Sequence, residues 1–120
     1  MILADTSVWV DHLARGRGDL AALLDEEQVL MHPFVIGELA CGDIRNRRQI
    51  LRLLTTLPSA TVASDDEALD MIEKRKLMGR GLGWVDVHLL ASSVLSSCRI
   101  WSRDKQLAAA AAELKVRFDR

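Results

Sequence analysis

The chain has 120 residues, of which 49% are hydrophobic and 28% are charged, and its formal net charge is -1. These values are typical of one globular domain that needs no disulfide or structural metal to fold, and they exclude a disordered chain. No apolar run approaches the ~18 residues of a membrane span, and no signal segment precedes the first predicted strand, so we expect a cytoplasmic protein without membrane association. The near-zero charge also excludes nucleic-acid binding by global charge, so any such contact must be local.

Short apolar segments alternate along the chain with segments of helical periodicity. The predicted strands are residues 2–4, 28–31, 60–63, 98–102 and 115–118. The predicted helices are residues 8–13, 20–24, 33–41, 47–57, 65–78, 85–96 and 104–114. Pro33 suits a first helical turn, and Ser64 with Glu67 three residues later forms a capping-box pattern. Strands separated by helices predict an α/β fold, a parallel sheet with helices on both faces.

The cysteines and tryptophans all lie within apolar patterns. We therefore expect Cys41 and Cys98 to be buried, reduced thiols rather than a disulfide or a metal pair. For the same reason Trp9, Trp84 and Trp101 are expected in the core or at a subunit interface rather than as base-stacking platforms.

Two aspartates follow predicted strands. Asp5 ends the first apolar segment, in "ILADTSVWV", and Asp104 lies just past the fourth, in "IWSRDKQL". Ligands of open parallel sheets bind beyond the carboxyl ends of the strands, where the strand order reverses, so both carboxylates would meet there if these strands are neighbours. Because both residues also precede helices, a simple helix-capping role is the alternative for each.

Two further acids lie within mostly apolar helices, Glu38 in "FVIGELACG" and Asp86 in "GLGWVDVHLLAS". Burying an unpaired carboxylate is costly. The structural alternatives are an exposed position for Glu38 and a favourable interaction with the helix N-terminus for Asp86. If the acids instead gather in one site, a hard divalent cation with oxygen ligands, Mg²⁺ or Mn²⁺, is the economical way to neutralise them.

At these residues the sequence resembles a known family. The segments "ADTSVWVDHL", "GELACG", "GLGWVDVHLLAS" and "WSRDKQL" are similar to the four acidic motifs of PIN-domain ribonucleases, specifically the VapC-type toxins of bacterial type II toxin-antitoxin modules. The resemblance covers essentially the whole chain. It implies one PIN domain over residues 1–120, with a parallel sheet in the order 3-2-1-4-5.

The resemblance also implies an activity. Asp5, Glu38, Asp86 and Asp104 would hold one or two Mg²⁺ or Mn²⁺ ions, and a metal-activated water would attack an RNA phosphodiester. Polar support would come from Thr6, Ser7 and Ser102, the last standing where many family members have threonine. A homodimer and a small cognate antitoxin of the VapB type are the implied partners.

Two other functions compete with this interpretation. A phospho-acceptor domain of the receiver type also has an acidic pocket, but it would need a second acid beside Asp5 and an acceptor aspartate ending the third strand, where only Asp65 is near. A catalytically silent binding module would keep the fold without needing all four acids. The arginines and lysines at 45–52 and 74–80 indicate solvated helix faces by default, and phosphate contacts if the substrate is RNA.

Overall fold

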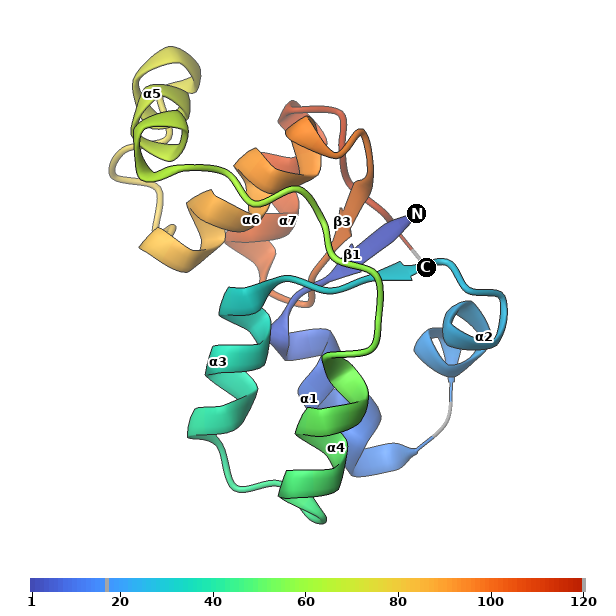
Figure 1. Cartoon of the computed structure of the whole chain (residues 1–120). Coiled ribbons are helices and arrows are strands. Elements are labelled where there is room, and N and C mark those ends of the chain that lie inside the picture. The colour runs from blue at the N-terminus through green and yellow to red at the C-terminus, as the bar shows by residue number, and fades with distance from the viewer. Residues whose placement is uncertain (17, 120) are drawn as a thin grey trace.

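A computed structural model of the chain describes residues 1–16 and 18–119 (Figure 1). The strands are β1 (Ile2–Ala4), β2 (Val29–Leu30) and β3 (Arg99–Trp101). The helices are α1 (Thr6–Arg15), α2 (Asp19–Asp25), α3 (Pro33–Cys41), α4 (Arg47–Leu54), α5 (Asp65–Arg75), α6 (Trp84–Leu95) and α7 (Lys105–Glu113). Among these described residues, no helix is long and apolar enough to cross a lipid bilayer.

The sheet is parallel, with β1 between β2 and β3. Ile2 pairs with Val29 on one side of β1, and Leu3 pairs with Ile100 on the other. Figure 1 shows α1, α3 and α4 on one side of this sheet and α6 and α7 on the other. A central strand covered on both faces must be apolar throughout, and all three residues of β1 are buried. The predicted α/β class with helices on both faces is therefore confirmed.

The predicted number of strands is wrong, because within residues 1–16 and 18–119 the sheet has three strands and not five. The expected third strand, residues 60–63, is reduced to an isolated parallel bridge between Met31 and Ser59 beside β2. Beyond this bridge the backbone amides turn away from the sheet: Thr61 N–H donates to Ser96 Oγ at 2.7 Å and Ala63 N–H donates to Ser92 Oγ at 3.1 Å. The hydroxyls of Ser92 on α6 and of Ser96 directly after it thus accept hydrogen bonds from amides that a longer strand would pair with its neighbour.

The expected fifth strand, residues 115–118, is likewise a single parallel bridge, between Ile100 and Arg117 beside β3. Val116 C=O accepts from Ile100 N–H at 2.7 Å, and Phe118 N–H donates to Ile100 C=O at 2.8 Å. The two bridges flank the sheet where the order 3-2-1-4-5 places its outer strands, but only the central order β2-β1-β3 consists of strands.

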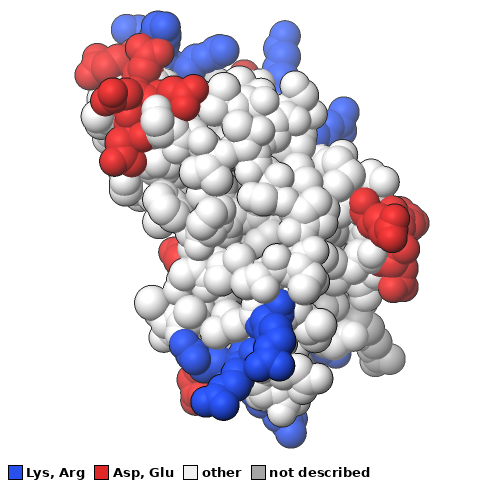
Figure 2. Space-filling view, in the orientation of Figure 1, with Lys and Arg blue, Asp and Glu red and all other residues white. Residues whose placement is uncertain are grey.

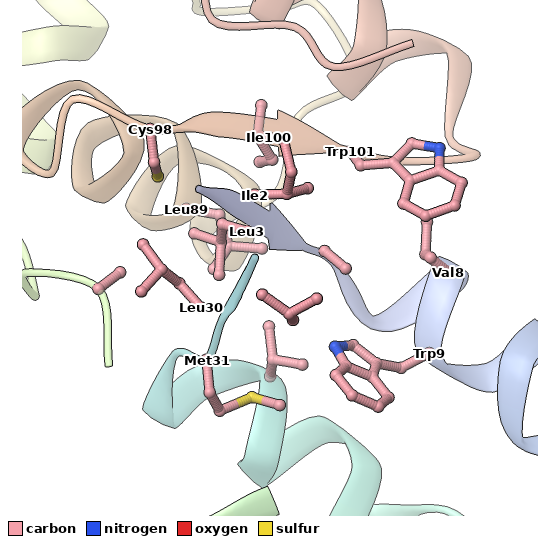
Figure 3. Close-up of a cluster of buried hydrophobic side chains, with 14 of the residues drawn as sticks. Ile2, Leu3, Val8, Trp9, Leu30, Met31, Leu89, Cys98, Ile100 and Trp101 are labelled. Atoms are coloured by element: carbon pink, nitrogen blue, oxygen red, sulfur yellow. The ribbon is translucent and has the colours of Figure 1, made fainter. Parts of the chain in front are cut away.

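The core lies around the sheet and the first turns of α1 (Figure 3). Trp9 and Trp101 are buried there, as predicted, and so is Cys98. Cys41 departs from the prediction, because it is exposed, and Trp84 lies outside the core of the single chain, so of its two expected places only a subunit interface stays a prediction. Each lies at a helix end, where one side of the residue has no further turn to cover it.

Helix ends follow local chemistry. Asp5 caps α1 by accepting from Val8 N–H, and Gly16 ends that helix with φ 75°, a left-handed conformation that favours glycine. The capping box predicted at Ser64 and Glu67 is present at the start of α5. These caps fix where each helix begins relative to the strand before it, and so fix the acids at those junctions.

Candidate active site

Asp5 forms the buried floor of the candidate site. It directly follows β1, and only 6% of its surface is exposed. Its Oδ1 accepts from Ser7 Oγ at 2.5 Å and from Val8 N–H at 3.2 Å, and its Oδ2 accepts from Ser102 Oγ at 2.5 Å. Three donors therefore fix the orientation of the carboxylate.

Ser102 connects Asp5 to Asp104. The Ser102 hydroxyl donates to Asp5 and accepts from Asp104 N–H at 2.9 Å. Asp104 Oδ1 in turn accepts from Leu107 N–H at 3.0 Å and caps α7. Since β1 and β3 are neighbours, the strand-end argument from the sequence is correct for these two acids, and the capping role is present as well.

Glu38 reaches the same region from α3. It is exposed, and its Oε1 accepts from Thr6 Oγ1 at 2.5 Å. Thr6 is the first residue of α1, directly after Asp5. This hydrogen bond ties the middle of α3 to the start of α1, so the exposed position expected as the alternative for Glu38 is compatible with a place beside Asp5.

Asp86 enters from the first turn of α6, as predicted. Its Oδ2 accepts from Gly83 N–H at 2.9 Å. The preceding glycine loop is anchored on α7: a side chain at Gly81, whose φ is +77°, would meet Gln106 Cγ at 3.3 Å, and Arg80 Nη1 lies 2.6 Å from Glu113 Oε2. The loop therefore holds the start of α6, and Asp86 with it, near α7, whose N-cap is Asp104.

The carboxylates act on one another. Burial raises the pKa of Asp86, and the negative charges of Asp104, Asp5 and Glu38 raise it further, against the opposing hydrogen bond from Gly83. Among residues 1–16 and 18–119, none of these four acids forms an ion pair with lysine or arginine. Within the same residues, no three Asp, Glu, His or Cys side chains lie close enough to hold one metal ion together. Within the described residues, the four acids thus lie in one region with no lysine or arginine paired to them, but not close enough together to form a complete metal site.

Both predicted basic clusters keep charges that form no ion pair with the described residues, and in the cluster at 74–80 these are Arg75 and Lys76. Lys74 pairs with Asp70, and Arg80 pairs with Glu113. On α4, Arg48 and Arg52 are exposed and form no ion pair with any residue that the structure describes. Figure 2 shows basic side chains gathered where α4 lies in Figure 1, and acidic side chains over α5 at the opposite end.

One polar contact behind the acids was not predicted from the sequence. His88, with 2% of its side chain exposed, places Nε2 3.0 Å from Asp65 Oδ1, which links α6 to the start of α5. Trp84 packs against the His88 ring. The only sequence signal was the spacing of Trp84 and His88, which puts both on one face of α6.

Removing the Ser102 hydroxyl is expected to lower the free energy of unfolding by about 1–3 kcal/mol, because Asp5 loses a donor to a charged oxygen and Asp104 N–H loses its acceptor. Urea denaturation of Ser102→Ala measures this change, and Ser102→Thr, which keeps the hydroxyl, is the matched control. Equal stability of Ser102→Ala and the unmodified chain would contradict the coupling of Asp5 to Asp104 through Ser102.

Comparison with known proteins agrees with this arrangement. The family model described as "PIN domain" matches residues 2–113. The chain belongs to the PIN domain family. It is also 46% identical over 117 residues to "Ribonuclease VapC32" from two strains of Mycobacterium tuberculosis, CDC 1551 / Oshkosh and ATCC 25618 / H37Rv, covering 97% of this chain and 94% of each relative. All four acids of this PIN domain lie within the matched residues.

Proposed function

We propose that this PIN domain, over residues 1–120, is a metal-dependent endoribonuclease that hydrolyses RNA phosphodiester bonds and acts as the toxin of a toxin-antitoxin pair. The observation that carries the proposal is that the charges of Asp104, Asp5 and Glu38 act on the Asp86 carboxyl, while no lysine or arginine in the described part of the chain forms an ion pair with any of the four acids. Membership of the family and the high identity to a protein named a ribonuclease support it.

The donor set suits a divalent cation. Mg²⁺ and Mn²⁺ prefer carboxylate oxygens, and mutual repulsion of the acids is relieved by positive charge. The residues that would hold the ion are Asp5, Glu38, Asp86 and Asp104. No three of these side chains lie close enough in the described structure to hold one ion as they stand, so binding would require them to move closer together. When bound, such an ion supplies the charge that lowers the pKa of a water molecule and neutralises charge developing on the phosphate.

The residues themselves divide the work by their surroundings. Asp5 is buried and fixed by Ser7, Ser102 and a backbone amide, which makes it the rigid anchor of the site. Glu38 is exposed, so bulk water reaches its carboxylate, and Thr6 orients it. We assign Glu38 the orientation of the attacking water and Asp86 and Asp104 the remaining ligand positions.

The proposed partners follow from the same family. An RNA substrate meets the acidic site, a cognate antitoxin of the VapB type neutralises the protein, and the chain forms a homodimer in the cytoplasm. A receiver-type signalling role is disfavoured by Asp65, the nearest candidate acceptor, because its carboxylate is engaged by His88 at the start of α5.

The decisive experiment is incubation of the purified chain, free of any partner, with total cellular RNA in Mg²⁺ or Mn²⁺. We expect discrete fragments, because a folded site cuts at chosen bonds, and we expect EDTA to abolish them by removing the cation. Intact RNA in the presence of either metal, from a chain that is folded and binds the ion, would contradict the nuclease and favour the catalytically silent module.

A further inference from the structure

Trp84 is exposed beside the candidate active site, unlike the other two tryptophans. Trp84 exposes 42% of its surface, whereas Trp9 exposes 2% and Trp101 5%. It is the first residue of α6, two residues before Asp86. A large aromatic side chain left in water next to a reaction site is unusual enough to need an explanation, because burying it would stabilise the fold.

The Trp84 ring is held in place from one side. Its centroid lies 4.5 Å from that of His88, with an interplanar angle of 85°, so the two rings meet edge to face. His88 is fixed by Asp65 through the 3.0 Å contact, and Phe34 packs against it at a centroid distance of 4.7 Å. This support reduces the freedom of the indole, so a partner that stacks on the exposed part meets an ordered surface.

The aromatic cluster is continuous with the acids. Phe34 and Glu38 are four residues apart on α3, which places them on one helix face one turn apart. Trp84 and Asp86 lie in the first turn of α6 but, being two residues apart, on different sides of the helix. The connection from the aromatic cluster to the acids therefore runs through Phe34 and Glu38 on α3, and a strand whose phosphate lies over Glu38 would place a neighbouring nucleotide at the cluster.

We propose that Trp84 is a stacking platform for an unpaired base of the RNA next to the cleaved bond, an inference that rests on the proposed ribonuclease function. Every base has an aromatic face, and stacking on tryptophan needs that face free of a paired helix. Trp84 would thus select single-stranded or looped segments rather than a particular base.

Steady-state cleavage of a single-stranded oligoribonucleotide gives the first test. Trp84→Leu keeps an apolar side chain but removes the aromatic face, so KM should rise roughly 10- to 100-fold while kcat changes little. Trp84→Phe, which retains an aromatic face, should restore most of the loss. Unchanged KM in Trp84→Leu, with the unmodified chain active and both folded, would overturn the stacking role but leave the ribonuclease proposal intact.

A binding test does not depend on cleavage. In an Asp86→Asn background, titration with the oligoribonucleotide should quench the tryptophan fluorescence, because only Trp84 is widely exposed, and Trp84→Phe should lose the quenching. An abasic ribose-phosphate chain of equal length is the matched probe and should quench little, since it keeps the charge without bases. Equal quenching by both probes, or none by either, would overturn the inference.

The competing explanation is that a second copy of the chain covers Trp84. In that case quenching of the tryptophan fluorescence by acrylamide would fall as the protein concentration rises, and the molar mass of the particle in solution would rise with it. Trp84→Leu would then lower the molar mass of the particle by weakening the association of the chains. That result would overturn the stacking proposal in favour of a subunit interface.

Discussion

Asp86→Asn is expected to abolish metal-dependent RNA cleavage without lowering the stability of the metal-free protein at neutral pH. The pKa of Asp86 is raised, by burial first and then by Asp104, Asp5 and Glu38, so its charged form is disfavoured in the folded state. An amide removes that charge while its oxygen can still accept from Gly83 N–H. A neutral amide is, however, a poor ligand for Mg²⁺, so catalysis is lost.

The pH dependence has a defined sign. Because the folded pKa lies above the unfolded value, the charged carboxyl destabilises the fold once pH exceeds the unfolded pKa, and this penalty disappears as pH falls and the group is protonated. In the absence of metal, Asp86→Asn should therefore have a higher free energy of unfolding than the unmodified chain at neutral pH, and this difference should vanish in acid. Thermal denaturation across this range, with and without Mg²⁺, measures it; only the unmodified chain should gain stability from the ion.

Glu67→Gln is the matched control. Glu67 holds the same third helical position in the capping box of α5 that Asp86 holds in α6, but it is exposed and outside the acidic site. It should leave both cleavage and the stabilisation by Mg²⁺ intact. Retained cleavage by Asp86→Asn would refute the site assignment.

Acid is expected to unfold the protein partly through His32, with a loss of about 3 kcal/mol between neutral pH and pH 4. Burial, and next the nearby His88, lower the pKa of His32 to about 4. Its Nδ1 accepts from Phe34 N–H at 3.0 Å, and its Nε2 lies 3.1 Å from Ser92 Oγ. Protonation of His32 Nδ1 would remove the acceptor of the Phe34 N–H and place two donors face to face. It would also create a charge on a side chain with no exposed surface.

The direction follows from proton binding. A folded pKa below the ordinary value of 6.5 means that the unfolded chain binds this proton first, so stability falls as pH drops from about 6.5 toward 4. His32→Asn can still accept from the Phe34 N–H as a helix cap, but it has no group that gains a proton in this pH range. The variant therefore separates the effect of His32 protonation from the loss of the cap. Urea denaturation at several pH values should give a shallower acid slope for the variant, although its stability at neutral pH is lower. Parallel slopes would exclude His32 as a source of acid sensitivity.

Most helices were predictable from the sequence because their signals are local. Pro33 begins α3, and Ser64 with Glu67 begins α5, as the pattern indicated. The loss of the outer strands could not be predicted from the sequence. Residues 60–63, for example, are as apolar as a strand that does form. Their amides instead donate to two hydroxyls that are distant in the sequence, Ser92 on α6 and Ser96 directly after it.

The acids were found from the sequence by their positions, but their roles overlap in a way that spacing cannot resolve. Asp5 and Asp104 cap helices and also meet through Ser102, so the capping role is confirmed and the site role stays a proposal compatible with it. An apolar pattern misplaced Cys41, and a place in the core is wrong for Trp84, because a pattern reports the composition of a segment and not which neighbour covers it.

By itself the sequence determined the α/β class and the helix caps and indicated the four acids as candidates, since each of these signals depends on residues within a few positions of one another. Only the tertiary structure decided which predicted strands form and how the charges of the other three acids raise the pKa of Asp86. It also decided that Trp84 is exposed and packs against the buried His88 ring. The reason is physical: hydrogen-bond competition, electrostatic coupling and burial depend on distances between segments, and the packed fold sets those distances.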